Sequence, residues 1–308
     1  MVFLMGPTAS GKTDLAVELV RRFPFEIISV DSVMVYRELE VGSAKPDSAV
    51  LSEAPHRLID IVDPPDVYSA ARFRRDALVA IDAIRDGGAI PLLVGGTMLY
   101  FQALERGLSD LPAADPELRE RIARRAQQLG WPALHAELAE VDPESAARIH
   151  PNDPQRLQRA LEIYRLTGKT RSELWARAKT ADGLAATKLV LCPSARSELH
   201  GRIERRFDSM LDKGLVEEVA GLRSRWRLSL SSPAMRAVGY RQVWQHLDGE
   251  FDAPELRRRG VVATRRFAKR QLTWLRAQTD AQWMPHRGAV LLDRVVRHLA
   301  DQGVLPGH

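Results

Sequence analysis

The stretch that most constrains this chain is Gly6-Pro7-Thr8-Ala9-Ser10-Gly11-Lys12-Thr13, which satisfies the pattern G-x-x-x-x-G-K-[ST]. It follows a short apolar run, Val2 to Met5, and precedes a helical pattern, and in this context it is a phosphate-binding loop. Its backbone N–H groups point at one anion, Lys12 adds a compact charge, and the Thr13 hydroxyl suits Mg²⁺. A nucleotide such as ATP is the ordinary ligand, but the pattern alone leaves the phosphate compound open.

Composition sets the class of protein. With 308 residues, 45% of them hydrophobic, the chain can bury the core of one large or two modest domains. Cys192 is the only cysteine, so neither an internal disulfide nor a cysteine-based zinc site is possible. No apolar run approaches the roughly 18 residues of a membrane span, and Met1 to Met5 lacks the basic start of a targeting segment. We therefore expect a cytoplasmic protein without a membrane partner, and a monomer.

Three apolar runs typical of buried strands end in polar groups. The first run leads into the phosphate loop, the run from Glu26 to Val30 ends at Asp31, and the run from Ala89 ends in a glycine pair followed by Thr97. Helical patterns lie between them, which predicts a doubly wound parallel sheet of the nucleotide-kinase kind with flanking helices. Ligands of such sheets bind beyond the carboxyl ends of the strands, so Asp31 and Thr97 should lie near the loop.

The strand signals disappear between Leu111 and about Thr187. Asp115-Pro116 and Asp153-Pro154 have the form of an N-cap followed by proline in the first turn, and Gly130 and Gly168 stand where helices should end. The sequence therefore predicts an all-helical insertion over residues 115–187 within a catalytic core made of residues 1–114 and 188–308.

Two groups of cations point to anionic ligands. Arg202 and Arg206 are four residues apart on a long helix predicted to be capped by Ser194, so both guanidinium groups could address one anion, or pair with neighbouring acids in solvent. From Arg257 to Arg276 the chain has eight basic residues and no acidic one. This basic helix indicates either a polyanion-binding face or a solvated helix.

Taken together, these motifs resemble the bacterial tRNA dimethylallyltransferases, and they span nearly the whole chain. One departure is Ser43, where that family usually has threonine. The matching stretches are GPTASGKT (6–13), ISVDS (28–32) with Tyr36, GSAKP (42–46), GGTMLY (95–100), NDPQRLQRALE (152–162), RIERRF (202–207), AVGYRQ (237–242) and ATRRFAKRQLTWLR (263–276).

The resemblance implies a reaction in which the N6 amine of the adenosine 3′ of the anticodon takes the dimethylallyl group of dimethylallyl diphosphate and diphosphate leaves. Negative charge builds on the departing diphosphate, which the loop, Lys12 and a Mg²⁺ held through Thr13 would stabilise. The residues expected to bind diphosphate are Gly6, Thr8, Ala9, Ser10, Gly11, Lys12, Thr13, Arg202 and Arg206.

The expected catalytic residues are Asp31, Thr97 and Lys12. The resemblance makes Asp31 the general base that takes the N6 proton, with Thr97 positioning the substrate. A strand-terminal aspartate in other phosphate-loop enzymes holds Mg²⁺ instead, and this role is the alternative for Asp31.

The resemblance also implies contacts with the anticodon stem-loop of tRNA. Sequence in RNA is read mostly from unstacked loop bases, which favours the segment from Ser32 to Lys45 and the segment from Gln155 to Arg159. Arg119 is either a further contact or an ordinary surface arginine. The residues expected to contact tRNA are Asp31, Ser32, Val33, Met34, Lys45, Thr97, Arg119, Gln155, Arg156, Leu157, Gln158, Arg159, Arg236, Gly239, Tyr240, Arg241, Lys269 and Arg270.

Three other functions use the same loop. A small-molecule kinase would need an adenine site and a lid arginine pair, which we cannot assign in this sequence. An isopentenyltransferase acting on free adenylate would need neither the helical insertion nor the basic helix. A non-catalytic RNA-binding module would not need Lys12, Thr13 and Asp31 to be intact.

Overall fold

The computed structural model describes residues 1–107, 111–178, 184–285 and 290–306. The chain divides into two compact units, one formed by Met1–Ala103 with Ala185–His308 and the other by Leu104–Leu184. The second unit thus begins before residue 115, where the sequence places the start of the insertion, because it includes the end of a preceding helix, α4 (Met98–Arg106).

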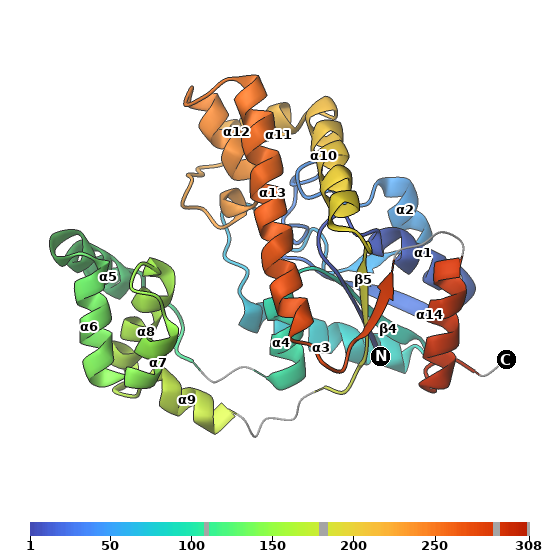
Figure 1. Cartoon of the computed structure of the whole chain (residues 1–308), viewed down its shortest axis with the longest axis horizontal. Coiled ribbons are helices and arrows are strands. Elements are labelled where there is room, and N and C mark those ends of the chain that lie inside the picture. Colours follow the sequence, from blue (N-terminus) through green and yellow to red (C-terminus); the bar gives the residue numbers. More distant parts are fainter. Residues whose placement is uncertain (108–110, 179–183, 286–289, 307–308) are drawn as a thin grey trace. The chain divides into compact units, whose positions relative to one another are not determined.

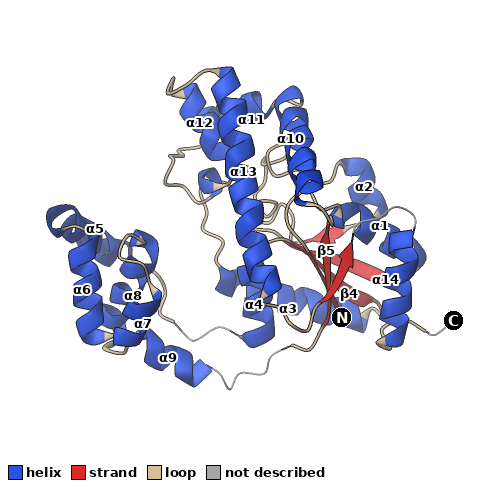
Figure 2. Cartoon of the chain, in the orientation of Figure 1, coloured by secondary structure: helices blue, strands red, loops and turns tan. Residues whose placement is uncertain are grey.

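The first unit is built on a six-stranded parallel sheet of order β3-β2-β4-β1-β5-β6 (Figures 1 and 2). Met5 of β1 and Val30 of β2 both lie opposite Gly95 of β4, so these three strands end at the same level. The segments that follow them therefore emerge together at one edge of the sheet. The strands are β1 (Val2–Met5), β2 (Phe25–Val30), β3 (His56–Arg57), β4 (Ile90–Gly95), β5 (Thr187–Cys192) and β6 (Gln282–Pro285).

Helices cover both faces of the sheet. Alternate side chains of a strand point to opposite faces, and all four residues of β1 are buried, so both faces need a covering layer. Val2 and Leu4 belong to a buried cluster with residues of α1 (Lys12–Arg22) and α14 (Val290–Asp301). Phe3 points the other way, and its ring lies 5.0 Å from that of Phe101 on α4. This arrangement is the doubly wound architecture that the alternating strands and helices predict.

The remaining helices of this unit differ in how their first turns are capped. The predicted Ser194 cap is wrong: α10 begins at Arg196 with Ala195 at the N-cap position and no side-chain capping bond. Asp252 does cap the basic helix, α13, by accepting from the Glu255 amide at 3.0 Å. The bounds are α2 (Ser48–Glu53), α3 (Ala70–Asp86), α10 (Arg196–Asp212), α11 (Leu215–Arg225), the 3₁₀ turn η1 (Ala234–Arg236), α12 (Tyr240–Leu247) and α13 (Ala253–Arg276).

The described part of the second unit is helical. Asp115 and Asp153 accept hydrogen bonds from the amides of Leu118 and Arg156, at 2.9 and 3.1 Å, so both predicted caps are present. The core of the unit includes Ile122, Leu134 and Leu161. Its helices are α5 (Pro116–Leu129), α6 (Trp131–Val141), α7 (Pro143–Arg148), α8 (Pro154–Thr167) and α9 (Arg171–Ala178).

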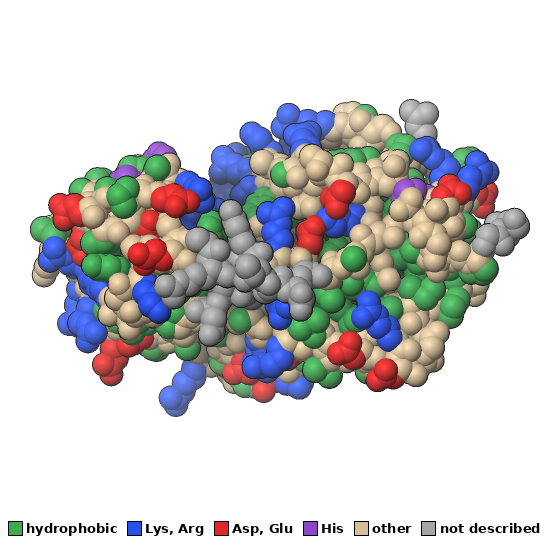
Figure 3. Space-filling view, turned by 90° about the horizontal axis from the view of Figure 1, so that it is seen from below, with side chains coloured by type: hydrophobic (Ala, Val, Ile, Leu, Met, Phe, Trp, Pro, Cys, Tyr) green, Lys and Arg blue, Asp and Glu red, His purple; other side chains and the backbone are tan. Residues whose placement is uncertain are grey.

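The surface charge is mixed in the view of Figure 3. Basic and acidic side chains are both scattered over this face, and a group of Lys and Arg side chains stands together at its upper edge in this view. None of the helices in the described ranges combines the length and the apolar character needed to cross a bilayer.

Candidate active site

The phosphate loop runs from the end of β1 to the start of α1. Gly11 precedes the helix with a φ of 86°, in the left-handed region that favours glycine. Lys12 Nζ donates to the Pro7 carbonyl at 2.8 Å and lies 3.4 Å from Ser10 Oγ, so the lysine folds over its own loop. Lys12 and Thr13 line a cavity of about 420 Å³, which we call the site cavity.

Two cations meet in the site cavity, Lys12 and Arg206 of α10. Burial lowers the pKa of Lys12 to about 7, and repulsion from Arg206 adds to this effect, whereas attraction to Asp31 opposes it. Burial also lowers the pKa of Arg206 below its ordinary value, again against the attraction of Asp31. Two cations held together away from water form a strong site for a multivalent anion, and the anion in turn restores the charge on the lysine.

Asp31 and Thr97 follow neighbouring strands and are linked through the backbone. Asp31 Oδ1 accepts from the amides of Val33 and Met34, at 2.8 and 3.2 Å, which fixes the carboxylate in an Asx turn. Thr97 Oγ1 accepts from the Ser32 amide at 3.2 Å. A carboxylate and a hydroxyl thus line the same cavity as the two cations.

The structure brings together a large part of the predicted site. Because the strands β1, β2 and β4 end at one level, their loops share the cavity with α10, η1 and α13. The predicted residues that line it are Thr8, Lys12, Thr13, Asp31, Ser32, Val33, Met34, Thr97, Arg206, Arg236 and Arg270.

A second hollow, of about 460 Å³, lies on α12 and α13 and is lined by Arg236, Arg241, Arg258, Arg259, Arg266 and Arg270. We call it the arginine groove. Arg258 and Arg259 both pair with Glu255, at 2.6 and 2.8 Å. Within the described parts of the chain no ion pair engages the other four arginines. Arg236 and Arg270 line both the groove and the site cavity, so the two hollows adjoin.

Models of two protein families match this chain. The IPP transferase family model matches residues 34–278. The tRNA dimethylallyltransferase of Alkalilimnicola ehrlichii is 60% identical over 278 residues, which cover 90% of this chain and 88% of that one. The chain belongs to the IPP transferase family. A second model, isopentenyl transferase, matches residues 1–61.

Solved structures of IPP transferase relatives have the same fold. The tRNA isopentenylpyrophosphate transferase of Bacillus halodurans superposes with a TM-score of 0.72 at 34% identity, covering 98% of this chain and 95% of that one. A eukaryotic dimethylallyltransferase acting on tRNA superposes with a TM-score of 0.82 at 26% identity, covering 98% of this chain and 78% of that one.

A second sequence relative is equally similar. The tRNA dimethylallyltransferase of Thioalkalivibrio sulfidiphilus is 60% identical over 277 residues, which cover 90% of this chain and 87% of that one.

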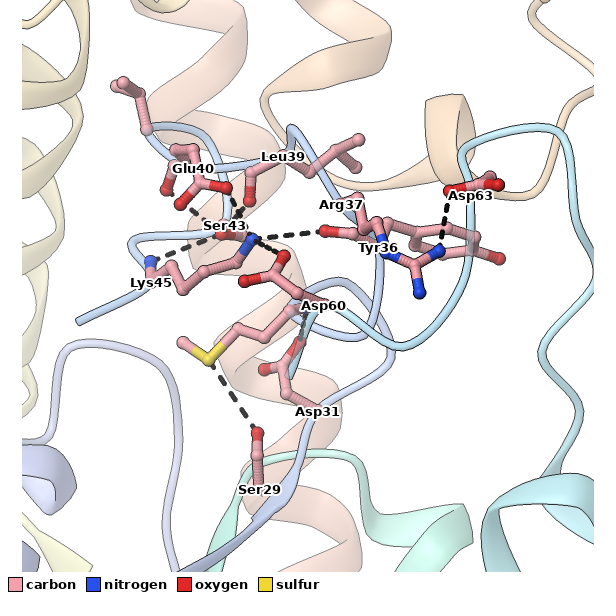
Figure 4. Close-up of polar contacts among 12 residues, drawn as sticks. Ser29, Asp31, Tyr36, Arg37, Leu39, Glu40, Ser43, Lys45, Asp60 and Asp63 are labelled. Atoms are coloured by element: carbon pink, nitrogen blue, oxygen red, sulfur yellow. Dashed lines mark hydrogen bonds and ion pairs between the residues drawn. The ribbon is translucent and has the colours of Figure 1, made fainter. Parts of the chain in front are cut away.

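Lys45 of this IPP transferase has an internal role, which corrects the expected contact of its ammonium with tRNA. Its side chain is only 2% exposed, and Nζ donates to Glu40 at 2.8 Å, to the Tyr36 carbonyl at 3.2 Å and to Asp60 (Figure 4). Ser43 Oγ donates to the Leu39 carbonyl at 2.6 Å in the same loop. These bonds hold the segment that follows Asp31 in one conformation.

Glu218 of α11 anchors this loop of the IPP transferase from the other side. Its carboxylate accepts from the amides of Glu40, Val41 and Gly42, at 2.9, 2.6 and 3.1 Å, and from the Tyr240 hydroxyl at 2.7 Å. Burial, reinforced by Glu218, raises the pKa of Tyr240, so the hydroxyl remains a donor. Tyr240 is fully buried, so its side chain fixes the loop. The expected contact of this side chain with tRNA is therefore corrected to a structural role.

In the helical unit, Glu162 organises the predicted arginines. The carboxylate is fully buried and accepts from Arg119 at 2.8 Å, from Arg159 at 2.6 Å and from the Asp115 amide at 2.9 Å. Burial opposes ionisation, but the bonds from Arg119 and Arg159 outweigh it and keep the pKa of Glu162 below its ordinary value. Arg119 therefore braces α5 against α8, whereas Arg159, which lies on α8 like Glu162, ties that helix to the Pro112 carbonyl before α5.

The other predicted residues of α8 divide by exposure. Gln155 and Arg156 are exposed, whereas Gln158 donates to the Arg119 carbonyl at 2.9 Å. Leu157 is fully buried in the core of the unit, so the expected tRNA contact of its side chain is corrected to a packing role.

Two further residues differ from the predicted picture. Arg202 pairs with Glu198 at 2.8 Å and does not line the site cavity, whereas Arg206 does. Lys269 lines a separate cavity with Cys192, although its neighbour Arg270 faces the arginine groove. The sequence did not predict one buried residue of the site, Gln271. It lies in the stretch ATRRFAKRQLTWLR, but it is uncharged, so the basic pattern of this stretch does not single it out.

Proposed function

We propose that this IPP transferase moves the dimethylallyl group of dimethylallyl diphosphate to N6 of the adenosine 3′ of the anticodon in tRNA and releases diphosphate. The observation that carries the proposal is the shared cavity of Lys12, Arg206, Asp31 and Thr97, in which the Asp31 carboxylate attracts both cations. The names of the relatives support tRNA as the substrate, since both 60% identical proteins are tRNA dimethylallyltransferases.

The donor half of the reaction uses the phosphate loop. Breaking the bond between C1 of the dimethylallyl group and the diphosphate oxygen leaves both bonding electrons on diphosphate, so negative charge grows at the loop. The N–H groups of the loop, Lys12 and Arg206 oppose that charge, and one such donor is commonly worth about 3 kcal/mol of barrier.

Mg²⁺ fits the donor half through the Thr13 hydroxyl, which lines the site cavity beside Lys12. In the described ranges no group of three or more His, Cys, Asp or Glu side chains has the spacing of a metal cage. A magnesium ion that takes one protein hydroxyl and completes its shell with diphosphate and water matches this donor set, and it would neutralise part of the leaving-group charge.

The acceptor half of the reaction uses Asp31 and Thr97, which line the same cavity. The N6 lone pair forms the new bond to C1, the nitrogen becomes positively charged, and one of its protons passes to the Asp31 carboxylate. The nearby Thr97 hydroxyl orients the base. Because Asp31 is already fixed by the amides of Val33 and Met34, it can accept this proton without first changing conformation.

The tRNA itself would be held by the arginine groove and the helical unit. Arg236, Arg241, Arg266 and Arg270 carry charge that phosphates can neutralise, and the groove adjoins the cavity where the adenosine must enter. Leaving its stack costs the adenosine a few kcal/mol, which these contacts would offset. On the helical unit, the exposed Gln155 and Arg156 are the candidates for direct contact.

We propose that the active protein is a monomer. Sedimentation of the active protein, with a sedimentation coefficient expected for 34.5 kDa, would test this proposal.

The deciding experiment incubates a tRNA pool, an anticodon stem-loop and AMP separately with dimethylallyl diphosphate and Mg²⁺. Mass analysis should find one added dimethylallyl group on tRNA and on the stem-loop, located beside the anticodon, and none on AMP. Preferential modification of AMP would instead favour a free-adenylate transferase. Transfer of labelled phosphate from ATP to a small metabolite, without prenyl transfer, would make the chain a kinase.

A further inference from the structure

Gln271 of α13 connects two loops that the chain keeps far apart in sequence. Its side chain is only 5% exposed, and both of its polar atoms are used. Oε1 accepts from the Thr8 amide at 2.9 Å, and Nε2 donates to the Gly96 carbonyl at 2.7 Å. One side-chain amide thus joins the phosphate loop to the loop that carries Thr97.

The chemistry of this bridge requires an amide. One partner is a donor and the other an acceptor, so the side chain must accept at one atom and donate at the other. A carboxylate would satisfy the Thr8 amide but place a second lone pair against the Gly96 carbonyl. The fit is also tight, because a Cβ on Gly96 would lie 2.3 Å from Gln271 Nε2.

The bridge lies where the two reactants meet. β1 and β4 are hydrogen-bonded neighbours up to the pair Met5 and Gly95, and beyond that point the sheet no longer holds their loops together. Gln271 closes this gap. The Thr8 amide is committed to Gln271, so the phosphate ligand is left to the N–H groups that follow it in the loop.

We propose that Gln271 is a positioning residue that sets the distance between the diphosphate loop and Thr97, and thereby aligns the prenyl donor with the accepting amine. This inference rests on the function proposed above. Misplacing reacting groups by about 1 Å can reduce a rate about 100-fold, so a bridge between the donor and acceptor loops acts on the rate of transfer more than on tRNA binding.

A purely structural role for Gln271 predicts a different result. If the side chain of Gln271 only fills space, replacing it lowers the stability of the protein, and the effect does not depend on whether the substituted side chain is protonated. The test therefore needs a substitute whose hydrogen bonding changes with pH while its shape stays constant.

Gln271→Glu provides this substitute. Above the pKa of the introduced carboxyl, the side chain repels the Gly96 carbonyl; when protonated, it donates to Gly96 and accepts from Thr8 as the amide does. Burial next to a carbonyl raises the pKa of a carboxyl, so the switch falls within a measurable range. Gln271→Met is the matched control, with similar size and neither bond.

At pH 8 we expect kcat of Gln271→Glu to fall at least 10-fold with a KM for tRNA within about twofold of the wild type. The ratio of its kcat to that of the wild type should rise at least fivefold between pH 8 and pH 5.5, whereas the ratio for Gln271→Met should stay flat. A flat ratio for Gln271→Glu, or Gln271→Met with wild-type kcat, would overturn the proposal. If Gln271→Glu does not fold at pH 8, Gln271→Met is compared with Gln271→Asn, and both must lower kcat at constant KM.

Titration with inorganic diphosphate separates this proposal from the proposed function. If the wild type transfers no dimethylallyl group, the function fails, but the bridge is still tested: Gln271→Glu should bind diphosphate at least fivefold more weakly at pH 8 and approach the wild type at pH 5.5. Equal affinity of the two proteins at both pH values would refute a role for Gln271 in shaping the loop.

Discussion

The carboxylate of Glu218 on α11 and the hydroxyl of Tyr240 on α12 lie 2.7 Å apart, and the same carboxylate also receives three backbone amides of the loop from Glu40 to Gly42. Four donors converge on one side chain. The loop after Asp31 therefore depends on two helices that come almost 200 residues later in the chain.

Removing the Glu218 anchor should loosen this loop. Glu218→Ala leaves three amides and a buried hydroxyl without an acceptor, and we expect the free energy of unfolding to fall by about 3 kcal/mol. The KM for tRNA should rise more than the KM for dimethylallyl diphosphate. Denaturant unfolding and steady-state kinetics would check this. Tyr240→Phe, which removes one of the four donors, should cost about 1 kcal/mol; an equal loss in both variants would contradict the anchor.

Asp31 can be tested with a variant that keeps its turn. Asn at this position can still accept from the amides of Val33 and Met34 but cannot take a proton. If Asp31 is the general base, Asp31→Asn should lose about 100-fold or more in kcat, the scale of general-base catalysis, with tRNA affinity within about twofold. Single-turnover kinetics and filter binding would measure the two. Near-normal transfer by Asp31→Asn would exclude the role.

The pKa of Lys12, lowered to about 7, predicts a pH dependence of diphosphate binding. A bound anion favours the charged lysine, so its pKa rises on binding and the site takes up a proton at pH values above 7. The affinity for inorganic diphosphate should therefore decrease as the pH rises through 7. Calorimetry in buffers of different ionisation enthalpy would count the protons. Lys12→Met is the control that subtracts the titration of diphosphate itself, and an identical proton uptake by this variant would contradict the prediction.

The arginine groove predicts which cations set the salt dependence of tRNA affinity. Arg270→Ala should reduce the slope of log affinity against log salt by about one unit, the effect of losing one phosphate contact. Lys269→Ala should reduce it less, because Lys269 faces a different cavity. Arg21→Ala removes the same charge from α1, where Arg21 pairs with Glu53, and serves as the control. Equal slopes for all three variants would place the tRNA elsewhere.

Glu162 predicts a stability effect confined to the helical unit. Glu162→Gln removes the negative charge that Arg119 and Arg159 share and leaves a single amide oxygen to accept from them. It should lower the free energy of unfolding by about 2 kcal/mol, since both arginines keep some contact with water. Because the pKa of Glu162 is lowered in the folded protein, its contribution is present above the unfolded value near 4.5 and is lost as the pH falls. The wild type should therefore lose more stability than Glu162→Gln on acidification.

The carboxyl ends of the strands could be predicted from sequence because their signals are local. A parallel sheet sends the residues after its strands to one edge, so the positions of Asp31, Thr97 and the phosphate loop follow from the order of strands and helices alone. The edge strands β3 and β6 could not be found this way. One has two residues, and two of the four residues of the other are exposed, so neither carries the apolar run that marks a buried strand.

The roles of Gln271 and Glu218 could not be predicted from the sequence for a different reason. Each is a single polar residue in a helix, where a solvent-exposed position is the ordinary expectation. Their partners lie 263 and 175 residues away for Gln271 and 176 to 178 residues away for Glu218. Only the tertiary structure supplies such partners. The partners of Lys45 are near in sequence, with Glu40 5 and Asp60 15 residues away, but the sequence alone does not show that the loop folds so that both carboxylates reach its ammonium.

The contact of Gln271 with Thr8 also bears on how this chain is made. The phosphate loop leaves the ribosome before α13 is synthesised, so a nascent chain carries its anion-binding loop before the helix that braces it exists. The hydrogen bond from the Thr8 amide can form only once α13 has folded onto the loop. Premature termination before Gln271 would thus yield a protein that contains Lys12, Asp31, Thr97 and Arg206 but lacks the amide that aligns them.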